Sequence, residues 1–471
     1  MNFSTKPRKG LRAIRQALNR DQFFWLLIAV AILLRIGVIF TFNVNRHLYF
    51  SDTLYYIRVA QEPNRLVIND GAPATSIGPI YPLFLTPFFQ LFPADMRVAP
   101  VVAARLSQAM FDVLAIITIY LIARQQVGQY VARIALVMQA LDLRYVLQIS
   151  ALGTETLFIT LFVIFMLAYL IAIEQDKLHR FIGSGALLGL AVLTRPIPLL
   201  FPAVLAIHIW FSYPENRRRA IARIVVMTLA MGLIMSPWVI RLWVATGTLL
   251  PVSNTGLAHF WLTSQPRGDE FGGASWDRAA IQDVNQSTGQ QVNGVAEISQ
   301  QDYLIAAFRN ILATPSEWIQ RVAIRLLSAF KQPYGTLLIP GDTPKVSFNQ
   351  VLKDVRSGRA PIGELLSYPS LGWRTIIYFW HYYTLILGSL GLVLAIQSSG
   401  WKVFPLVGWI VYNSVLLAFL AVEPRYLFPV MFAFTIFAAY GTMRLWNLIR
   451  FAVNRSWTVP RKRADAHPAR Q

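Results

Sequence analysis

The sequence contains no cysteine, which excludes disulfide bonds, thiolate metal sites and cysteine nucleophiles. Its six histidines are scattered and lack the HxxxH or HxH spacing of a histidine metal site. Charged residues are also scarce, at 14%, whereas a soluble domain carries roughly a quarter. These absences argue against a soluble enzyme that uses a cysteine or a histidine-bound metal.

Apolar residues are abundant instead. Hydrophobic residues make up 55% of the 471 residues, and the mean hydropathy is +0.47. Several apolar runs are long enough to cross a bilayer as helices. The composition therefore predicts an all-α polytopic membrane protein.

The net charge of +20 is concentrated in a few segments. Residues 1–20 and 450–471 each hold six basic residues, and Arg217, Arg218 and Arg219 form a further cluster. By contrast, residues 244–372 hold ten Lys and Arg against ten Asp and Glu. Basic short segments beside a neutral long one follow the positive-inside rule, so the charge indicates topology rather than a nucleic-acid partner.

This pattern predicts about ten transmembrane helices with both termini in the cytoplasm. The apolar run 22–41 lacks a signal-peptide cleavage site, so we expect it to be retained. The tract 181–211 is read as two short helices, broken at Thr194-Arg195-Pro196-Ile197-Pro198. The expected spans are 22–41, 101–123, 131–149, 154–173, two within 181–211, 220–243, 375–397, 402–421 and 427–449.

The spans divide the chain into five parts. The parts are a cytoplasmic tail 1–21, an N-terminal transmembrane catalytic core 22–243 with a first exterior loop 42–100, an exterior loop region 244–372, C-terminal transmembrane helices 373–449 and a cytoplasmic tail 450–471. The proline-broken run 78–92 and the amphipathic stretch 303–330 are expected to lie as helices on the outer membrane surface. Residues 285–293 are predicted to form a loop, and no internal repeat is visible.

The predicted topology places the unusual polar residues on the exterior side. Asp52, flanked by aromatic residues, follows the first span, and Glu155 opens the fourth. Each residue also has a simpler explanation. Asp52 would serve as a helix N-cap, Glu155 as an acid in a first helical turn, and Arg195 as a side chain that snorkels to the interface. The further members of this set are Asn254 and His259 after the seventh span, and the pair Glu423 and Arg425, which would form a local loop ion pair.

Carboxylates and arginines at one membrane surface also suit a particular chemistry. Arginine binds phosphate through a charge-assisted, bidentate fork. A carboxylate can remove the proton from a hydroxyl nucleophile. Together they favour transfer of a group from a lipid phosphate at the outer leaflet.

The chain resembles the C-type glycosyltransferases that use polyprenyl-phosphate sugars. Relatives in that superfamily are the protein O-mannosyltransferases and the bacterial lipid A aminoarabinose transferases, which are of the family 39 type. The resemblance extends from about residue 22 to 449. It is carried by SDTLYY at 51–56, GPIYPLF at 78–84, AARLSQ at 103–108, TETLF at 154–158, GLAVLTRP at 189–196, PWVIR at 237–241 with Gly247 and Asn254, and EPRY at 423–426.

The resemblance implies a set of roles. Asp52 matches the loop acid that would deprotonate the acceptor hydroxyl for inverting attack on the sugar, and Glu155 matches a second acidic position. Arg425, with Arg195 and Arg241, would neutralise the departing polyprenyl phosphate. The same motifs supply the remaining substrate-binding candidates, Tyr55, Tyr56, Tyr81, Asn254, Glu423 and Tyr426.

The sequence departs from the mannosyltransferases in one place. They often show a paired Asp-Glu where this chain has Asp52-Thr53, which argues against protein O-mannosylation. No cofactor is demanded, although a divalent cation is possible near Asp52 and Glu155. The expected partners are a polyprenyl-phosphate-linked sugar, membrane lipid, and a lipid, glycan or protein acceptor, with the site on the periplasmic or exterior face of the inner membrane.

Two other functions stay open at this stage. A polytopic transporter of lipids or sugar-lipids also places charges within broken helices, but often contains inverted repeats. A lipid-linked glycan ligase would use a bulkier donor.

Overall fold

The computed structural model describes residues 21–41, 51–66, 68–69, 72–73, 76–92, 96, 98–253, 255–265, 274–334, 338–339, 348–368, 370–420 and 424–456. These residues are almost entirely helical, and β1 (Ile68–Asn69) and β2 (Ala72–Pro73) form a small antiparallel hairpin. The all-α prediction is confirmed. The predicted substrate-binding residues Asn254 and Glu423 lie outside the described residues, as do most of both basic tails.

The first half of the chain, to residue 246, forms eleven helical elements within the described residues. They are α2 Gln22–Thr41, α3 Ser51–Gln61, η2 Pro63–Leu66, α4 Ile80–Leu91, α5 Ala99–Val127, α6 Gln129–Leu141, α7 Leu143–Gln148, α8 Thr154–Gln175, α9 Leu178–Thr194, α10 Phe201–Ser212 and α11 Arg217–Thr246. The second half contains α12 Thr255–Ser264, α13 Ala274–Thr288, η4 Val295–Glu297, α14 Gln300–Ala313, α15 Pro315–Lys331, α16 Phe348–Arg356, α17 Ile362–Leu366, α18 Leu371–Ser399, η6 Gly400–Val403, α19 Phe404–Phe419, α20 Pro424–Leu427, η7 Phe428–Val430 and α21 Met431–Ser456.

The chain is an integral membrane protein. Among the described residues, six stretches are long and apolar enough to cross a membrane: 22–41, 99–127, 154–175, 217–246, 371–419 and 425–452. The stretch 371–419 contains both α18 and α19. Helices α9 and α10 are apolar but shorter. Each of the ten predicted spans coincides with a helix or a broken pair of helices, while the number of crossings remains a prediction.

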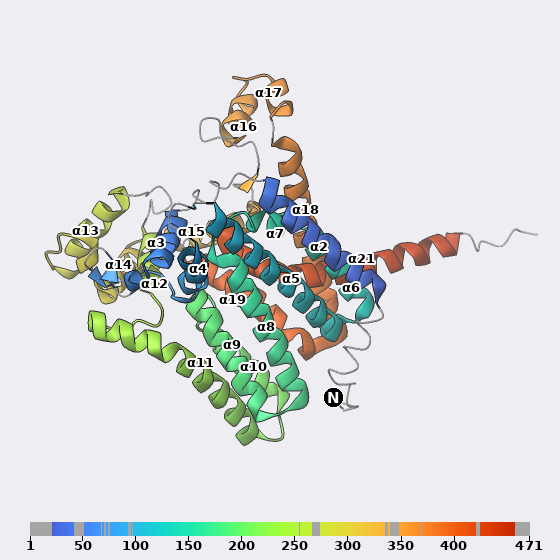
Figure 1. Ribbon diagram of the computed structural model, residues 1–471, viewed down its shortest axis with the longest axis horizontal. Coiled ribbons are helices and arrows are strands. Elements are labelled where there is room, and N and C mark those ends of the chain that lie inside the picture. Colours follow the sequence, from blue (N-terminus) through green and yellow to red (C-terminus); the bar gives the residue numbers. More distant parts are fainter. Residues whose placement is uncertain are drawn as a thin grey trace, which may run out of the picture.

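Proline and glycine shape this bundle. Helix α9 ends at Thr194 and α10 begins at Phe201, so the chain breaks where the prolines predicted. Helices α18 and α21 approach so closely that a Cβ at Gly391 would collide with the Phe437 carbonyl oxygen. Small residues allow such contacts between helices in a bilayer. Figure 1 shows α8, α9, α10 and α11 side by side in the lower half of the molecule.

The main hydrophobic core lies between α5, α6, α8 and the first half of α21. Arg35 of α2 is fully buried there, and its Nε donates to Asp112 Oδ2 at 2.7 Å. Its Nη1 also donates to the Ala140 carbonyl at 2.6 Å. Arg35 therefore faces other helices, as expected for a charge within an apolar span.

A second, smaller core lies outside the bundle. Helices α12, α13 and α14 gather at one side of the molecule (Figure 1) and pack around the buried Trp261. The prediction that residues 285–293 form a loop was wrong for residues 285–288, because α13 continues to Thr288. Burial of Val284 in this core, and two hydrogen bonds between Asn285 and Val292, hold the end of α13 in helical form.

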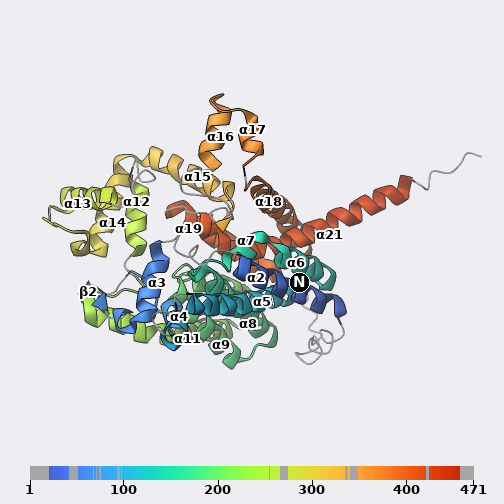
Figure 2. The same cartoon turned by 45° about the horizontal axis from the view of Figure 1, so that its top comes forward.

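Helix α15 runs from this group of helices toward α18 (Figure 2). It packs against α19, where the rings of Trp318 and Phe419 lie 5.5 Å apart. Helices α14 and α15 cover most of the stretch predicted to be amphipathic, and α4 covers the proline-broken run. Helices α16 and α17 project from the top of the molecule in Figure 1.

Candidate active site

Four charged residues from distant parts of the sequence meet at one end of the bundle. Asp52 lies in the first turn of α3 and Glu155 in the first turn of α8. Arg195 follows the last residue of α9, and Arg425 lies in α20. All four act electrostatically on the Tyr56 side chain, so they surround a common region.

Asp52 and Arg425 form the more exposed of two ion pairs. Arg425 Nη1 donates to Asp52 Oδ2 at 2.9 Å, across 373 residues of sequence. The Asp52 side chain is 42% exposed and that of Arg425 is 21% exposed. A carboxylate this accessible can meet a hydroxyl group that arrives from outside the protein.

Glu155 and Arg195 form the buried pair. Arg195 Nη1 donates to Glu155 Oε1 at 2.7 Å, and the side chains are 11% and 7% exposed respectively. Gln148 Nε2 lies 3.4 Å from the other oxygen, Glu155 Oε2. Gly153 leaves the space for that carboxylate, since a Cβ at this position would overlap Oε2. The glycine of the GTET sequence therefore has a steric role beside the acid.

The ring of Tyr426 connects the two pairs. The guanidinium carbons of Arg195 and Arg425 lie 5.7 and 5.4 Å from its centroid, within the range of a cation–π contact. Each cation is also paired with a carboxylate, so a bound anion would meet both guanidinium groups once it displaced the exposed Asp52 from Arg425. Two guanidinium groups on one ring suit an anion with several oxygens, such as a phosphate.

Two further tyrosines support this region from α3 and α4. The rings of Tyr56 and Tyr81 lie 5.1 Å apart in an edge-to-face arrangement, and both side chains are buried. Burial raises the pKa of Tyr56, and the Asp52 and Glu155 carboxylates raise it further, so its hydroxyl stays protonated. The Tyr81 hydroxyl donates to Gln108 Oε1 at 2.7 Å. Tyr56 and Tyr81 thus form an uncharged wall beside the four charges.

The remaining predicted residues have different surroundings. The Arg241 guanidinium lies 4.8 Å from the Trp238 ring centroid, and both residues belong to α11. Thr53 occupies the position where the mannosyltransferases often have a second acid. It is buried, and its hydroxyl donates to the Leu152 carbonyl at 2.9 Å. Thr53 therefore joins α3 to the segment before α8.

Sequence reasoning missed two residues of this region, Gln148 and Tyr334. The Tyr334 hydroxyl donates to Gln148 Oε1 at 2.6 Å, and both side chains are buried. Neither residue belongs to the motifs that carry the resemblance. A sequence signal was present only for Gln148, which with Ser150 interrupts an apolar stretch just before the acidic helix start.

The arrangement offers an accessible carboxylate, two arginines and an aromatic ring between them. Within the described ranges, no three histidine, aspartate or glutamate side chains converge as a metal site would require. We therefore assign no metal ligand. The site has the groups for proton removal from a hydroxyl and for binding of an anionic leaving group.

Comparisons with known proteins bear on this site. Residues 76–241 match the model of the dolichyl-phosphate-mannose-protein mannosyltransferase family. This segment contains Tyr81, Glu155, Arg195 and Arg241. No curated protein sequence matches the chain at a significant level.

Solved structures resemble the chain over most of its length. The Archaeoglobus fulgidus oligosaccharyltransferase AglB, in complex with an inhibitory peptide and a dolichol-phosphate, is 13% identical with a TM-score of 0.50; the match covers 95% of this chain and 53% of AglB. The apo form of the A. fulgidus oligosaccharyltransferase gives 12% identity, a TM-score of 0.51, and coverage of 94% and 53%. ArnT from Cupriavidus metallidurans, in the apo state, is 12% identical with a TM-score of 0.37 and coverage of 95% and 81%.

The chain spans about half the length of the oligosaccharyltransferases that it matches. At this level of identity, the likeness to them concerns the fold. The resemblance to the C-type glycosyltransferases is thus confirmed, by a family model over residues 76–241 and by the fold over most of the chain.

Proposed function

We propose that the chain is an inverting membrane glycosyltransferase. It would move a sugar from a polyprenyl-phosphate donor to a hydroxyl group of a lipid, glycan or protein. The observation that carries this proposal is the accessible Asp52 carboxylate, which is paired with Arg425, and Arg425 shares the Tyr426 ring with Arg195. The matched mannosyltransferase model and the shared fold support the donor class.

In this proposal Asp52 is the general base. It takes the proton of the acceptor hydroxyl while that oxygen attacks the anomeric carbon of the sugar. The bond between that carbon and the phosphate oxygen breaks, and polyprenyl phosphate departs. A single displacement inverts the anomeric configuration, and the phosphate is stable enough to leave without a general acid.

Arg195 and Arg425 stabilise the charge on the leaving phosphate. Arg195 is held in place by the buried Glu155, whereas Arg425 contacts the exposed base directly. A donor phosphate that binds Arg425 would compete with Asp52 for it. Arg241, beside Trp238, would also help to neutralise the departing lipid phosphate.

The positive-inside pattern supports a site on the outer face of the cytoplasmic membrane. Both basic tails would then be cytoplasmic, and the helices α12–α15 exterior. Reporter fusions after residues 60, 300 and 424 test this topology. All three should report an exterior location, and a cytoplasmic signal at residue 300 would overturn it.

The function itself is tested with purified protein and a panel of polyprenyl-phosphate sugars. Mass spectrometry of the lipid fraction should show free polyprenyl phosphate from at least one donor. A transporter would leave every donor intact, so intact donors with verified folded protein would reject the proposal. A lipid-linked glycan ligase would release the lipid only from a donor that carries a preassembled glycan.

A further inference from the structure

A chain of hydrogen bonds extends from Glu155 away from the charged site. Glu155 binds Arg195 through Oε1, and Gln148 Nε2 lies 3.4 Å from its Oε2. Gln148 Oε1 in turn accepts a hydrogen bond of 2.6 Å from the Tyr334 hydroxyl. Tyr334 lies 186 residues from Gln148 and follows the end of α15, so this chain joins the α12–α15 region to the buried ion pair.

The Glu155 carboxylate, which can only accept hydrogen bonds, sets which way the Gln148 amide faces, and Tyr334 satisfies the other end of that amide. Burial and the nearby Glu155 raise the pKa of the Tyr334 hydroxyl well above its usual value, so the hydroxyl keeps its proton and is able to donate to Gln148. Gln148 must then present its oxygen to Tyr334 and its NH₂ group to Glu155. The reversed amide would place an oxygen against the Glu155 carboxylate, with two acceptors facing each other.

Tyr334 also packs against the segment that carries the second arginine. Its ring lies 4.9 Å from the ring of Phe428, which follows α20 directly. Tyr145 contacts the same ring at 4.3 Å, from α7. Tyr334 therefore contacts both Gln148, which lies against Glu155, and Phe428, which follows the helix that carries Arg425.

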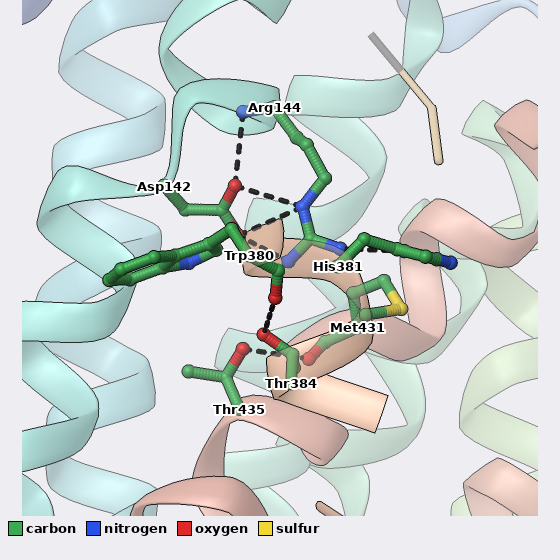
Figure 3. Close-up of polar contacts among 7 residues, drawn as sticks. All are labelled: Asp142, Arg144, Trp380, His381, Thr384, Met431 and Thr435. Atoms are coloured by element: carbon green, nitrogen blue, oxygen red, sulfur yellow. Dashed lines mark hydrogen bonds and ion pairs between the residues drawn. The ribbon is translucent and has the colours of Figure 1, made fainter. Parts of the chain in front are cut away.

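A buried polar cluster (Figure 3) connects α7, the helix that ends at Gln148, to the end of α15. The Arg144 side chain lies between the Asp142 carboxylate and the His381 ring, and its Nη1 is 3.0 Å from His381 Nδ1. His381 Nε2 lies 2.8 Å from the Phe330 carbonyl oxygen in the last turn of α15. One ring thus joins α7, α18 and the end of α15. The segment after α15 is fixed further by burial of Leu338 and Ile339 against Leu147.

We propose that Gln148 and Tyr334 are positioning residues for the donor phosphate. They hold one oxygen of Glu155 so that its other oxygen keeps Arg195 facing the leaving group. This inference rests on the proposed function and adds two residues, outside the motifs of the resemblance, to the donor side of the site. It also makes the end of α15 part of the catalytic architecture.

The test replaces Tyr334 by phenylalanine, which removes the hydroxyl and keeps the ring on Phe428. The KM for the polyprenyl-phosphate sugar should rise about fivefold, the equivalent of one hydrogen bond, while kcat stays near the wild-type value. Tyr382→Phe is the matched control. It removes a hydroxyl that donates to the Lys331 carbonyl at 2.8 Å at the same end of α15, and it should leave KM unchanged.

A second variant separates positioning from loss of structure. Gln148→Met keeps the length of the side chain without its amide, and it should raise KM as Tyr334→Phe does. In the double variant the two increases in KM should not multiply, because both substitutions interrupt the same hydrogen-bond chain from Tyr334 through Gln148 to Glu155. Multiplying increases, or a kcat loss at constant KM, would overturn the inference.

Binding of polyprenyl phosphate alone supplies a readout that does not depend on turnover. Its Kd should rise in Tyr334→Phe and Gln148→Met and stay constant in Tyr382→Phe. If the wild type cleaves donor and both variants bind polyprenyl phosphate as tightly as it does, the inference fails and the proposed function stands. If the wild type neither cleaves a donor nor binds polyprenyl phosphate, both fail.

Discussion

The two ion pairs of the site have the same chemistry and different surroundings. Glu155 and Arg195 are 7% and 11% exposed, and neighbouring side chains support the pair. Asp52 and Arg425 are 42% and 21% exposed. Charges removed from water depend strongly on their partner, whereas exposed pairs contribute roughly 0–1 kcal/mol. We infer that the buried pair fixes geometry and that the exposed pair is free to exchange partners with substrate.

This difference suits the two tasks of a transfer reaction. Binding of a leaving phosphate needs a cation whose direction is set before the substrate arrives. Proton removal needs a carboxylate that an incoming hydroxyl can reach. The structure places Arg195 in the first environment and Asp52 in the second.

The largest stability effect is expected from Glu155→Ala. It leaves Arg195 charged and nearly buried without its partner, at a cost of about 3–5 kcal/mol in the free energy of unfolding. Thermal unfolding in detergent measures the loss against Asp52→Ala. Equal losses for the two variants would contradict the distinction between the pairs.

Arg425→Ala should act on donor binding. Loss of one charge-assisted contact to phosphate, worth about 1.5–3 kcal/mol, corresponds to a rise of the donor KM by about 10–150-fold. Steady-state kinetics with varied donor and constant acceptor measure this effect. An unchanged donor KM would reject the phosphate role of Arg425.

Gly153→Ala tests the buried pair without removing a charge. The added methyl group overlaps the position of Glu155 Oε2, so the carboxylate must move, at a cost of about 1–3 kcal/mol. We expect a lower melting temperature and a raised donor KM. Gly232→Ala is the matched control because a Cβ there meets no atom within 4 Å.

The smallest stability effect is expected from Asp52→Asn. The side chain keeps its size and is 42% exposed, so the free energy of unfolding should change by about 0–1 kcal/mol. Melting curves of wild type and variant should nearly coincide. A drop as large as that of Glu155→Ala would mean that Asp52 is mainly structural.

Much of the fold could be predicted because hydropathy and proline act locally. The apolar runs, the break after Thr194 and the short helix α4 all follow from neighbouring residues. The end of α13 was predicted wrongly, because contacts with Trp261 and Val292 outweigh its loop-like composition.

The site could be predicted only as a list of residues on one side of the membrane, without their contacts. Asp52, Glu155, Arg195 and Arg425 were all named from the sequence, and the structure brings them together. Their pairing could not be predicted, because it joins residues 40 and 373 positions apart. Gln148 and Tyr334 were missed for the same reason, since a buried hydrogen bond between distant residues leaves no local pattern.

The most direct test of the account compares Asp52→Asn with wild type in one assay. Both purified proteins are incubated with the polyprenyl-phosphate sugar that the wild type cleaves and with its acceptor, and glycosylated acceptor and free polyprenyl phosphate are measured by mass spectrometry. Loss of the base should lower the rate of transfer by a factor of about 10²–10⁴ in a protein that melts like wild type. Transfer by Asp52→Asn at a rate close to that of wild type would contradict the assignment of Asp52 as the base.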